Sequence, residues 1–345
     1  MTRLWLGLLR ALHALLPFSV LAWLGERLGG LLYYASASRR RIGRTNLQLC
    51  FPDGDKYAIR RTLRAHFRAL GRATLLESVS WWGSRAELER GVRIEGQEHL
   101  TAVAGRPVIL LAPHFVGLNL GGVRVTAWLA PIVSLYASIK NPPINTLMLH
   151  ARTRFVGPDG TASEMYSRHD GIKPVLRALK KGRPFYYLPD MDYGPKDAIF
   201  VPFFGVPAAT ITALPRLAEA AGAVVVPCVT RWEAGPPVVA HSPLGQAQGP
   251  APTGWPGAVQ GPPREPSVRP SRGKKHAGRP GAFLEGRYVV RLYQAWEGYP
   301  SDDIEADTRR MNAFIEDRVR EMPEQYFWLH KRFKTRPEGQ PSLYD

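Results

Sequence analysis

Cysteine and acidic residues are both scarce in this chain. Cys50 and Cys228 are the only cysteines among 345 residues, which excludes a framework of several disulfides or a cysteine-rich metal cluster and fits a reducing compartment. Twenty-nine acidic residues face 46 basic ones, for a net charge of +17. An excess of this size predicts an acidic partner: nucleic acid, anionic lipid or an acidic carrier protein. The alternative, that the arginine content reflects a GC-rich genome, stays open.

Recognisable nucleic-acid-binding modules are also missing. The sequence contains no basic-aromatic repeat of the kind that binds nucleic acid, and we therefore expect no nucleic-acid partner. Anionic lipid and an acidic carrier protein remain as the expected partners of the positive charge.

A clean apolar run long enough to cross a bilayer is absent as well. Residues Leu4 to Gly25 are apolar apart from Arg10 and His13. About 20 apolar residues span a bilayer, so this stretch is a borderline spanning helix. Pro17 in its middle also permits an amphipathic helix in the membrane plane, and a buried hairpin of the globular domain is a third possibility.

The basic residues that follow this stretch give an orientation. Arg39, Arg40, Arg41 and Arg44 form a cluster, and positive residues beside a membrane segment are retained on the cytoplasmic side. We therefore expect residues 1–45 to be a membrane anchor with a basic juxtamembrane segment. The rest of the chain should then face the cytoplasm at the inner (plasma) membrane.

One internal segment has a composition unlike the rest. Residues 235–281 are dominated by Pro, Gly and basic residues, with Glu265 as their single acid. Such a segment buries too little apolar area to offset its ordering entropy. We expect a disordered insertion that divides one catalytic domain into residues 46–234 and 282–345. It is a neutral insert, a stretch read out of frame between compensating sequence errors, or a basic regulatory segment.

A short apolar run leads to the most informative residue, His114. Val108 to Ala112 predicts a buried strand, and His114 follows where open α/β sheets bind their ligands. Strands that alternate with helices predict an α/β fold with a mixed sheet flanked by helices. The other expected helices cover residues 55–82, 174–181, 212–221 and 302–322, the last capped by Ser301, and the other expected strands cover residues 184–188, 223–229 and 287–293.

Four blocks of sequence then occur in a fixed order. They are Arg44–Asp53, Pro107–Asn119, Tyr187–Thr210 and Pro323–Gly339. Together they resemble the lipid A biosynthesis acyltransferases, the lauroyl or myristoyl branch of the lysophospholipid acyltransferase superfamily. The resemblance implies a glycerolipid acyltransferase-like fold and transfer of a fatty acyl chain from acyl carrier protein to a hydroxyl of a lipid A precursor. It implies no cofactor and no metal.

The resemblance also assigns the catalytic residues. His114 matches the base that deprotonates the acceptor hydroxyl, and Asn119 stands where the family has the Asp or Glu of its His-x4-acid dyad. An amide cannot stabilise an imidazolium by charge. Asn119 therefore has three interpretations. The enzyme has reduced activity, the protein is a non-catalytic lipid- or carrier-binding relative, or position 119 carries a sequence or engineered change. An acyltransferase that acts on another lipid acceptor is a further alternative. Asp190 is carried over as a third catalytic residue.

The expected substrate-binding residues lie in three places. Arg152 and Arg154 match an arginine-containing stretch of the family and could hold phosphate through the planar guanidinium, although a solvated helix face would look the same. Asp192 is expected at the site, or only in a turn. The closing block supplies the last expected binding residues, His330, Lys331 and Arg332, in a basic cluster suited to lipid phosphates. A solvated terminus is the alternative.

Overall fold

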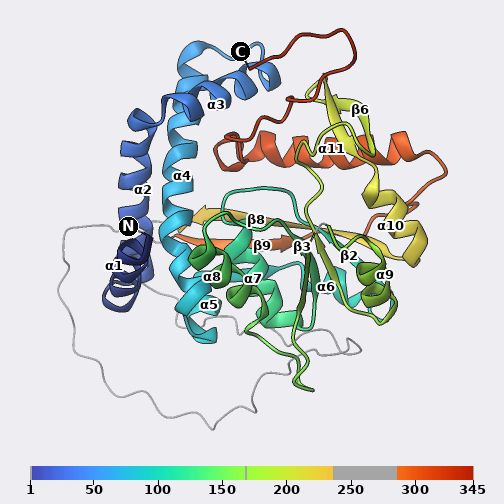
Figure 1. Cartoon of the computed structure of the whole chain (residues 1–345), viewed down its shortest axis with the longest axis horizontal. Helices are drawn as coiled ribbons and strands as arrows, with labels where there is room; N and C mark the ends of the chain where they lie inside the picture. The colour runs from blue at the N-terminus through green and yellow to red at the C-terminus, as the bar shows by residue number, and fades with distance from the viewer. Residues whose placement is uncertain (1, 168, 236–285, 345) are drawn as a thin grey trace.

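The computed structural model describes residues 2–167, 169–235 and 286–344 (Figure 1). The expected insertion lies outside them, apart from its first residue. The strands on either side of it, β8 (Val224–Ala234) and β9 (Gly286–Leu292), are antiparallel neighbours. Ala234 pairs with Gly286 at the open end, so residues 235–285 connect two adjacent strands.

Within the described residues, seven strands form the main sheet in the order β1-β9-β8-β2-β5-β3-β4. Besides β8 and β9 they are β1 (Val92–Glu95), β2 (Val108–Leu111), β3 (Val133–Tyr136), β4 (Glu164–Ser167) and β5 (Phe185–Tyr187). Neighbours run parallel except β8 and β9. A second sheet pairs β6 (Ala198–Phe203) with β7 (Val206–Ile211). The predicted α/β class with a mixed sheet is therefore confirmed.

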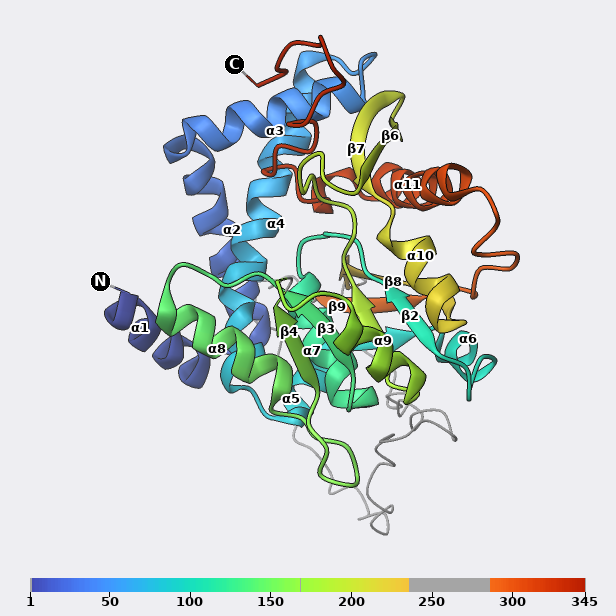
Figure 2. The same ribbon diagram turned by 45° about the vertical axis from the view of Figure 1, so that its right-hand side comes forward.

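Helices cover both faces of the main sheet (Figures 1 and 2). Every residue of β2 is fully buried, as expected for a strand packed on both faces. On one face, Val108 and Leu110 join a core with α1 (Thr2–Leu15), α2 (Phe18–Ala35), α5 (Arg85–Gly91), α6 (Gln97–Thr101), α7 (Leu118–Leu129) and α8 (Pro142–Thr153). On the other face, Ile109 and Leu111 join a core with α3 (Ala37–Cys50), α9 (Lys173–Lys180), α10 (Ala213–Ala221) and α11 (Ile304–Glu321).

The long helix α4 (Lys56–Trp82) connects these two cores. It begins at Asp55, whose carboxylate accepts a hydrogen bond from the Ala58 backbone N–H at 2.7 Å. The predicted helix is confirmed almost to the residue. For α11, the predicted N-cap Ser301 is wrong: Asp303 caps the helix by accepting from the Ala306 N–H at 2.9 Å. The Ser301 hydroxyl instead accepts from the Asp303 N–H at 3.2 Å.

Helix α2 lies against α4 in a very close crossing. A Cβ on Gly71 of α4 would be 2.2 Å from the Gly25 carbonyl oxygen and 2.6 Å from the Gly29 Cα of α2. Only glycine permits this approach. Glu26 of α2 forms an ion pair with Arg72 of α4. The acid that directly follows the N-terminal apolar stretch is therefore neutralised against the protein.

The N-terminal stretch differs from the expected single membrane helix. Pro17 divides it into α1 and α2, and both helices bury apolar residues against the domain, among them Leu9 and Leu21. In the part of the chain that the structure describes, no helix combines the length and apolarity needed to cross a bilayer. The expectation of a spanning helix is therefore not supported.

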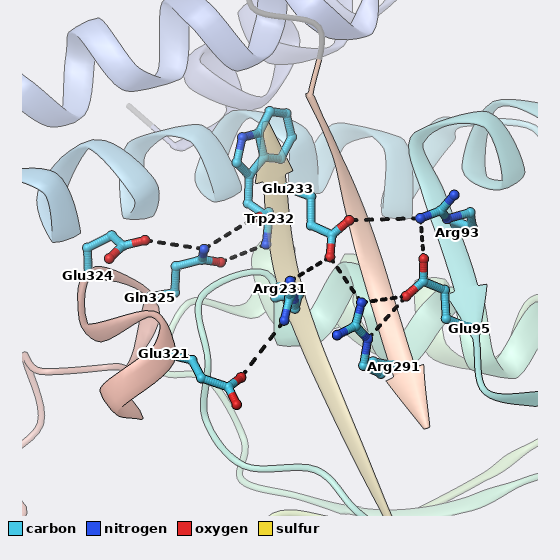
Figure 3. Close-up of polar contacts among 9 residues, drawn as sticks. All are labelled: Arg93, Glu95, Arg231, Trp232, Glu233, Arg291, Glu321, Glu324 and Gln325. Atoms are coloured by element: carbon cyan, nitrogen blue, oxygen red, sulfur yellow. Dashed lines mark hydrogen bonds and ion pairs between the residues drawn. The ribbon is translucent and has the colours of Figure 1, made fainter. Parts of the chain in front are cut away.

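The C-terminal segment is attached to the sheet by polar contacts (Figure 3). Gln325, in the short 3-10 helix η1 (Pro323–Gln325), accepts from the Trp232 N–H at 2.6 Å and donates to the Trp232 carbonyl at 3.0 Å. Beside it, an ion-pair network joins β1, β8, β9 and the end of α11 through Arg93, Glu95, Arg231, Glu233, Arg291 and Glu321. The closing block of the sequence is thus fastened to the strand that leads into the connection 235–285.

Candidate active site

Two neighbouring parallel strands bring the central pair of residues together. His114 follows β2 and Asp190 follows β5, and Leu111 of β2 is in register with Tyr187 of β5. The carboxyl ends of parallel strands share one edge of the sheet, where α/β proteins bind their ligands. Residues 76 positions apart therefore meet because of the sheet register.

The His114 ring is held by the Asp190 carboxylate. Nδ1 of His114 lies 2.7 Å from Oδ1 of Asp190, and the His114 backbone N–H donates to Oδ2 at 2.9 Å. Burial alone would raise the pKa of Asp190, but the His114 charge and these hydrogen bonds outweigh it, and the pKa lies below its ordinary value. The carboxylate is therefore ionised at neutral pH, Nδ1 carries the proton, and Nε2 is the ring nitrogen left to accept one.

The closing block holds the loop that carries His114. The Phe327 N–H donates to the His114 carbonyl at 3.0 Å, and the Val116 N–H donates to the Gln325 carbonyl at 2.7 Å. Gly117 turns the loop into α7 with φ of 95°, a conformation that favours glycine. These contacts explain why two sequence blocks far apart in the chain belong to one site.

A cavity of about 990 Å³ opens beside His114. This volume is in the range of pockets that hold sizeable organic ligands. Its walls come from α7, α8, β3, β5 and the loops after β4 and β5. The apolar lining includes Leu118, Ile132, Leu135, Met148, Leu149 and Met165. His114, Lys196, His330 and Lys334 are among the polar residues that line it, so an apolar chain and a polar group could be bound together.

Asn119 lines the same cavity but bonds to residues other than His114. Its Nδ2 donates to Oε2 of Glu77 on α4 at 2.7 Å, and its Oδ1 accepts from Nε of Arg152 on α8 at 2.8 Å. Burial raises the pKa of Glu77 to about 7, although the Asn119 hydrogen bond and the Arg152 charge oppose the rise. The carboxylate that orients the His114 ring is therefore Asp190, and residue 119 belongs to a separate polar cluster.

Two more of the expected site residues lie at the cavity, Asp192 and His330. Asp192 accepts hydrogen bonds from the backbone of Gly194 and Thr335, at 2.9 and 2.7 Å, which fastens the C-terminal loop beside the site. Nε2 of His330 accepts from the Asp192 N–H at 3.1 Å. Burial and the Arg332 charge lower the pKa of His330 to about 4, so this ring is neutral at pH 7.

The remaining expected binding residues point elsewhere. Arg154 stacks on Phe155, 4.4 Å from the ring centroid, and donates to the Val79 carbonyl. Arg332 is buried and donates to the Ala209 carbonyl at 2.9 Å. Lys331 lies over the Tyr344 ring at 5.4 Å. The predicted basic cluster is not one surface, because a backbone carbonyl binds Arg332, Lys331 lies over an aromatic ring, and His330 lines the cavity.

A family described as bacterial lipid A biosynthesis acyltransferase matches residues 1–244 and 283–335. The chain belongs to this family. The internal residues left out, 245–282, lie in the Pro/Gly-rich segment and its border, and the match ends at residue 335. The four blocks all fall inside the match except for the last residues of the fourth. The predicted resemblance is confirmed, and the protein is an acyltransferase.

Named relatives are similar over almost the whole chain. The lipid A biosynthesis lauroyltransferase of Escherichia coli K12 is 31% identical over 99% of this chain and 94% of its own length. The palmitoleoyltransferase of the same strain is 30% identical with the same coverage, and the myristoyltransferase is 25% identical over 94% of this chain and 83% of its own length. A solved 1-acyl-sn-glycerophosphate acyltransferase from Thermotoga maritima overlays with a TM-score of 0.35 and 14% identity, covering 86% of this chain and 96% of that one, too weak a likeness to add to the assignment.

Sequence reasoning missed two kinds of residue in this acyltransferase. Glu77 is one acid in a long helix, outside the four blocks that carry the resemblance. Lys196 and Lys334 line the cavity, but Lys196 is a single basic residue in its block and Lys334 is one of several in the closing block. A signal for Glu77 did exist, since a single acid among the apolar and basic residues of an expected helix needs a partner.

Proposed function

We propose that this acyltransferase moves a fatty acyl chain from the thioester of acyl carrier protein to a hydroxyl of a lipid A precursor, with His114 as the general base. The observation that carries the proposal is the His114–Asp190 pair at the wall of an apolar cavity. The same contact weakens the reason for a non-catalytic reading, because the carboxylate missing at residue 119 is present at residue 190.

The proton transfer follows from the orientation of the ring. Nε2 of His114 accepts the proton of the acceptor hydroxyl while that oxygen attacks the thioester carbonyl carbon. The C–O bond forms, the C–S bond breaks, and the leaving sulfur takes the proton back from the imidazolium. Asp190 stabilises the imidazolium between these steps, as an orienting carboxylate does in hydrolytic triads. No covalent acyl-enzyme is needed, because the hydroxyl attacks the donor directly.

The cavity suits both proposed substrates. Its apolar wall would take the fatty acyl chain, and the cationic side chains Lys196, Lys334 and Arg152 at its lining would bind phosphate groups. Phosphate occurs on the carrier's phosphopantetheine and on a phosphorylated glycolipid. The net charge of +17 would also favour encounter with an acidic carrier and an anionic membrane.

The proposal is tested by incubating the full chain with acyl carrier protein loaded with lauroyl, myristoyl or palmitoleoyl groups and a tetra-acylated lipid A precursor. We expect mass spectrometry to show one added acyl chain on the precursor and free carrier thiol in equal amount. Lysophospholipid in place of the precursor tests the rival acceptor. Transfer to lysophospholipid alone would overturn the proposed substrate, and transfer to neither would overturn the proposed reaction.

We also propose that the enzyme lies on the cytoplasmic face of the inner membrane through α1 and α2. Large apolar side chains are exposed on both helices: Leu4, Trp5, Leu8, Leu15, Leu28, Leu31, Leu32 and Tyr34. Leu4 is 80% and Leu15 is 79% exposed. Exposed arginines accompany them on the same helices, including Arg3, Arg10 and Arg27. This combination is typical of a helix that lies in the interface of an anionic membrane.

The position of α1 connects this surface to the cavity. Thr2 of α1 accepts a hydrogen bond from Asn141, the N-cap of α8, at 2.9 Å. Helix α8 supplies Met148, Leu149 and Arg152 to the cavity wall, and α1 lies beside it in Figure 2. Helix α8 therefore connects the exposed apolar helix α1 with the wall of the cavity beside His114.

Replacing Leu4 and Leu8 by Glu should detach the enzyme from vesicles that contain anionic phospholipid. Burying one leucine contributes about 1.5–3 kcal/mol, so the two changes should weaken vesicle binding at least tenfold in a sedimentation assay. Ile304→Glu is the matched control, since Ile304 is exposed at the start of α11, away from α1 (Figure 1). Equal binding of the two proteins would contradict the proposed membrane surface.

A further inference from the structure

Glu77 is the only acidic residue of α4, and the proposed proton transfer does not use it. It lies where α4 packs against α7 and α8. A carboxylate in such a place is costly unless a hydrogen bond or an opposite charge compensates it. The residues that compensate Glu77 therefore indicate what it does.

A chain of two hydrogen bonds joins Glu77 to Arg152 through Asn119. The Asn119 amide donates to the Glu77 carboxylate at 2.7 Å, and its carbonyl oxygen accepts from Nε of Arg152 at 2.8 Å. An ionised acid can only accept here and a guanidinium can only donate. Asparagine is suited to the middle position, because it has a donor on one side and an acceptor on the other.

The charges agree with this arrangement. Burial disfavours the charged form of Arg152, and Glu77 is the strongest influence that favours it. Arg152 and Asn119 both line the cavity beside His114, whereas Glu77 stands behind them. The guanidinium donates to Asn119 through Nε, which leaves the fork of its terminal nitrogens for a ligand. The carboxyl group expected at residue 119 is thus present one side chain further from the cavity.

We propose that Glu77 is a positioning residue: through Asn119 it holds the Arg152 guanidinium in the cavity, where that guanidinium binds a phosphate group of a substrate. The inference rests on the proposed function for the identity of the substrates. It also gives a physical reason for Asn119. An aspartate there would face the Glu77 carboxylate, and two carboxylates at this distance cannot both stay ionised.

The test exchanges the acid and the amide. We compare the full chain with Glu77→Gln, with Asn119→Asp and with the double variant, in which the new amide on α4 would donate to the new carboxylate on α7. KM and kcat are measured separately for the acyl carrier protein donor and for the lipid A precursor. An increase in KM for the donor alone identifies the phosphopantetheine phosphate as the ligand of Arg152, and an increase for the precursor alone identifies the glycolipid phosphate.

We expect Glu77→Gln to raise one of these KM values tenfold or more, with kcat changed less than threefold. The exchanged double variant should recover to within about threefold of the native KM, because one negative charge and both hydrogen bonds are restored. Arg152→Lys should raise the same KM, and adding Glu77→Gln to it should cause little further change. Rescue by exchange separates positioning from a structural role, since a carboxylate needed only for packing on α4 would not be replaced from α7.

Glu305→Gln is the matched control, an exposed acid on α11 that pairs with Arg309 one turn along the same helix. If Glu77→Gln behaves like this control, or if the exchange recovers nothing, the inference is wrong.

Failure of the proposed function is recognised separately, because the native chain would then transfer no acyl group. In that case the contact between Glu77 and Asn119 is tested by thermal unfolding. Asn119→Asp should lower the midpoint by about 3 °C or more at pH 8 but less at pH 6, and Glu77→Gln should reverse the loss. If the changes in the unfolding midpoint that the two single substitutions cause simply add in the double variant, the inference is wrong.

Discussion

Replacing His114 by Ala should lower kcat about a thousandfold without unfolding the enzyme. A positioned general base contributes about 10²–10⁴-fold to a rate, and His330 is unsuited to replace it, since it accepts from the Asp192 backbone and its pKa lies near 4. The KM values should change little, because the cavity wall and Arg152 remain. Transfer is measured by mass spectrometry under saturating donor and acceptor.

His150→Ala is the control for this experiment. His150 is exposed on the last turn of α8, only two residues from Arg152, and does not belong to the cavity lining. Its replacement should leave kcat within about twofold of native. A His114→Ala variant that keeps native kcat would show that another group removes the hydroxyl proton.

The architecture could be predicted where each element carries its own signal. Helix α4 has an apolar stripe and an Asp cap, and β2 is an apolar run of strand length. The N-terminal stretch was different, because apolarity alone does not distinguish a bilayer from a protein surface. The partners that decide the matter, Gly71 and Arg72 of α4, are more than 40 residues from Gly25 and Glu26. No local pattern contains that information.

The site shows the same division between local and long-range information. His114 could be predicted from the strand before it, and Asp190 from its block, but their contact depends on the pairing of β2 with β5. The dyad spacing drew attention to Asn119 as a defective orienting residue, whereas the carboxylate that orients the ring comes from another strand. Arg332 and Lys331 look alike in sequence and differ in structure, because only Arg332 is buried against the carbonyl of a neighbouring strand.

Replacing Asp190 by Asn should lower kcat by about 10³-fold or more while the shape of the site is kept. Oδ2 of Asp190 accepts the His114 backbone N–H, so the amide oxygen of the new Asn must stay on that side. Its NH2 group then faces Nδ1, which has to give up its proton and accept. The proton moves to Nε2, and the ring presents a donor where the hydroxyl needs an acceptor. In hydrolytic triads on another fold, the corresponding change costs about 10⁴-fold.

The stability of this variant gives a second and independent measurement. The pKa of Asp190 lies below its ordinary value because the His114 contacts outweigh burial. The stabilisation is therefore present above pH 4, near the unfolded value of about 3.9, and is lost as the pH falls through the lower folded-state pKa. Asp190→Asn should unfold more easily than native at pH 7, and the difference should shrink below pH 4. Asp317→Asn, an exposed acid on α11, should show neither effect. If Asn119→Asp instead restored kcat to the Asp190→Asn background, residue 119 would be able to orient the ring, and the assignment of that role to Asp190 alone would be wrong.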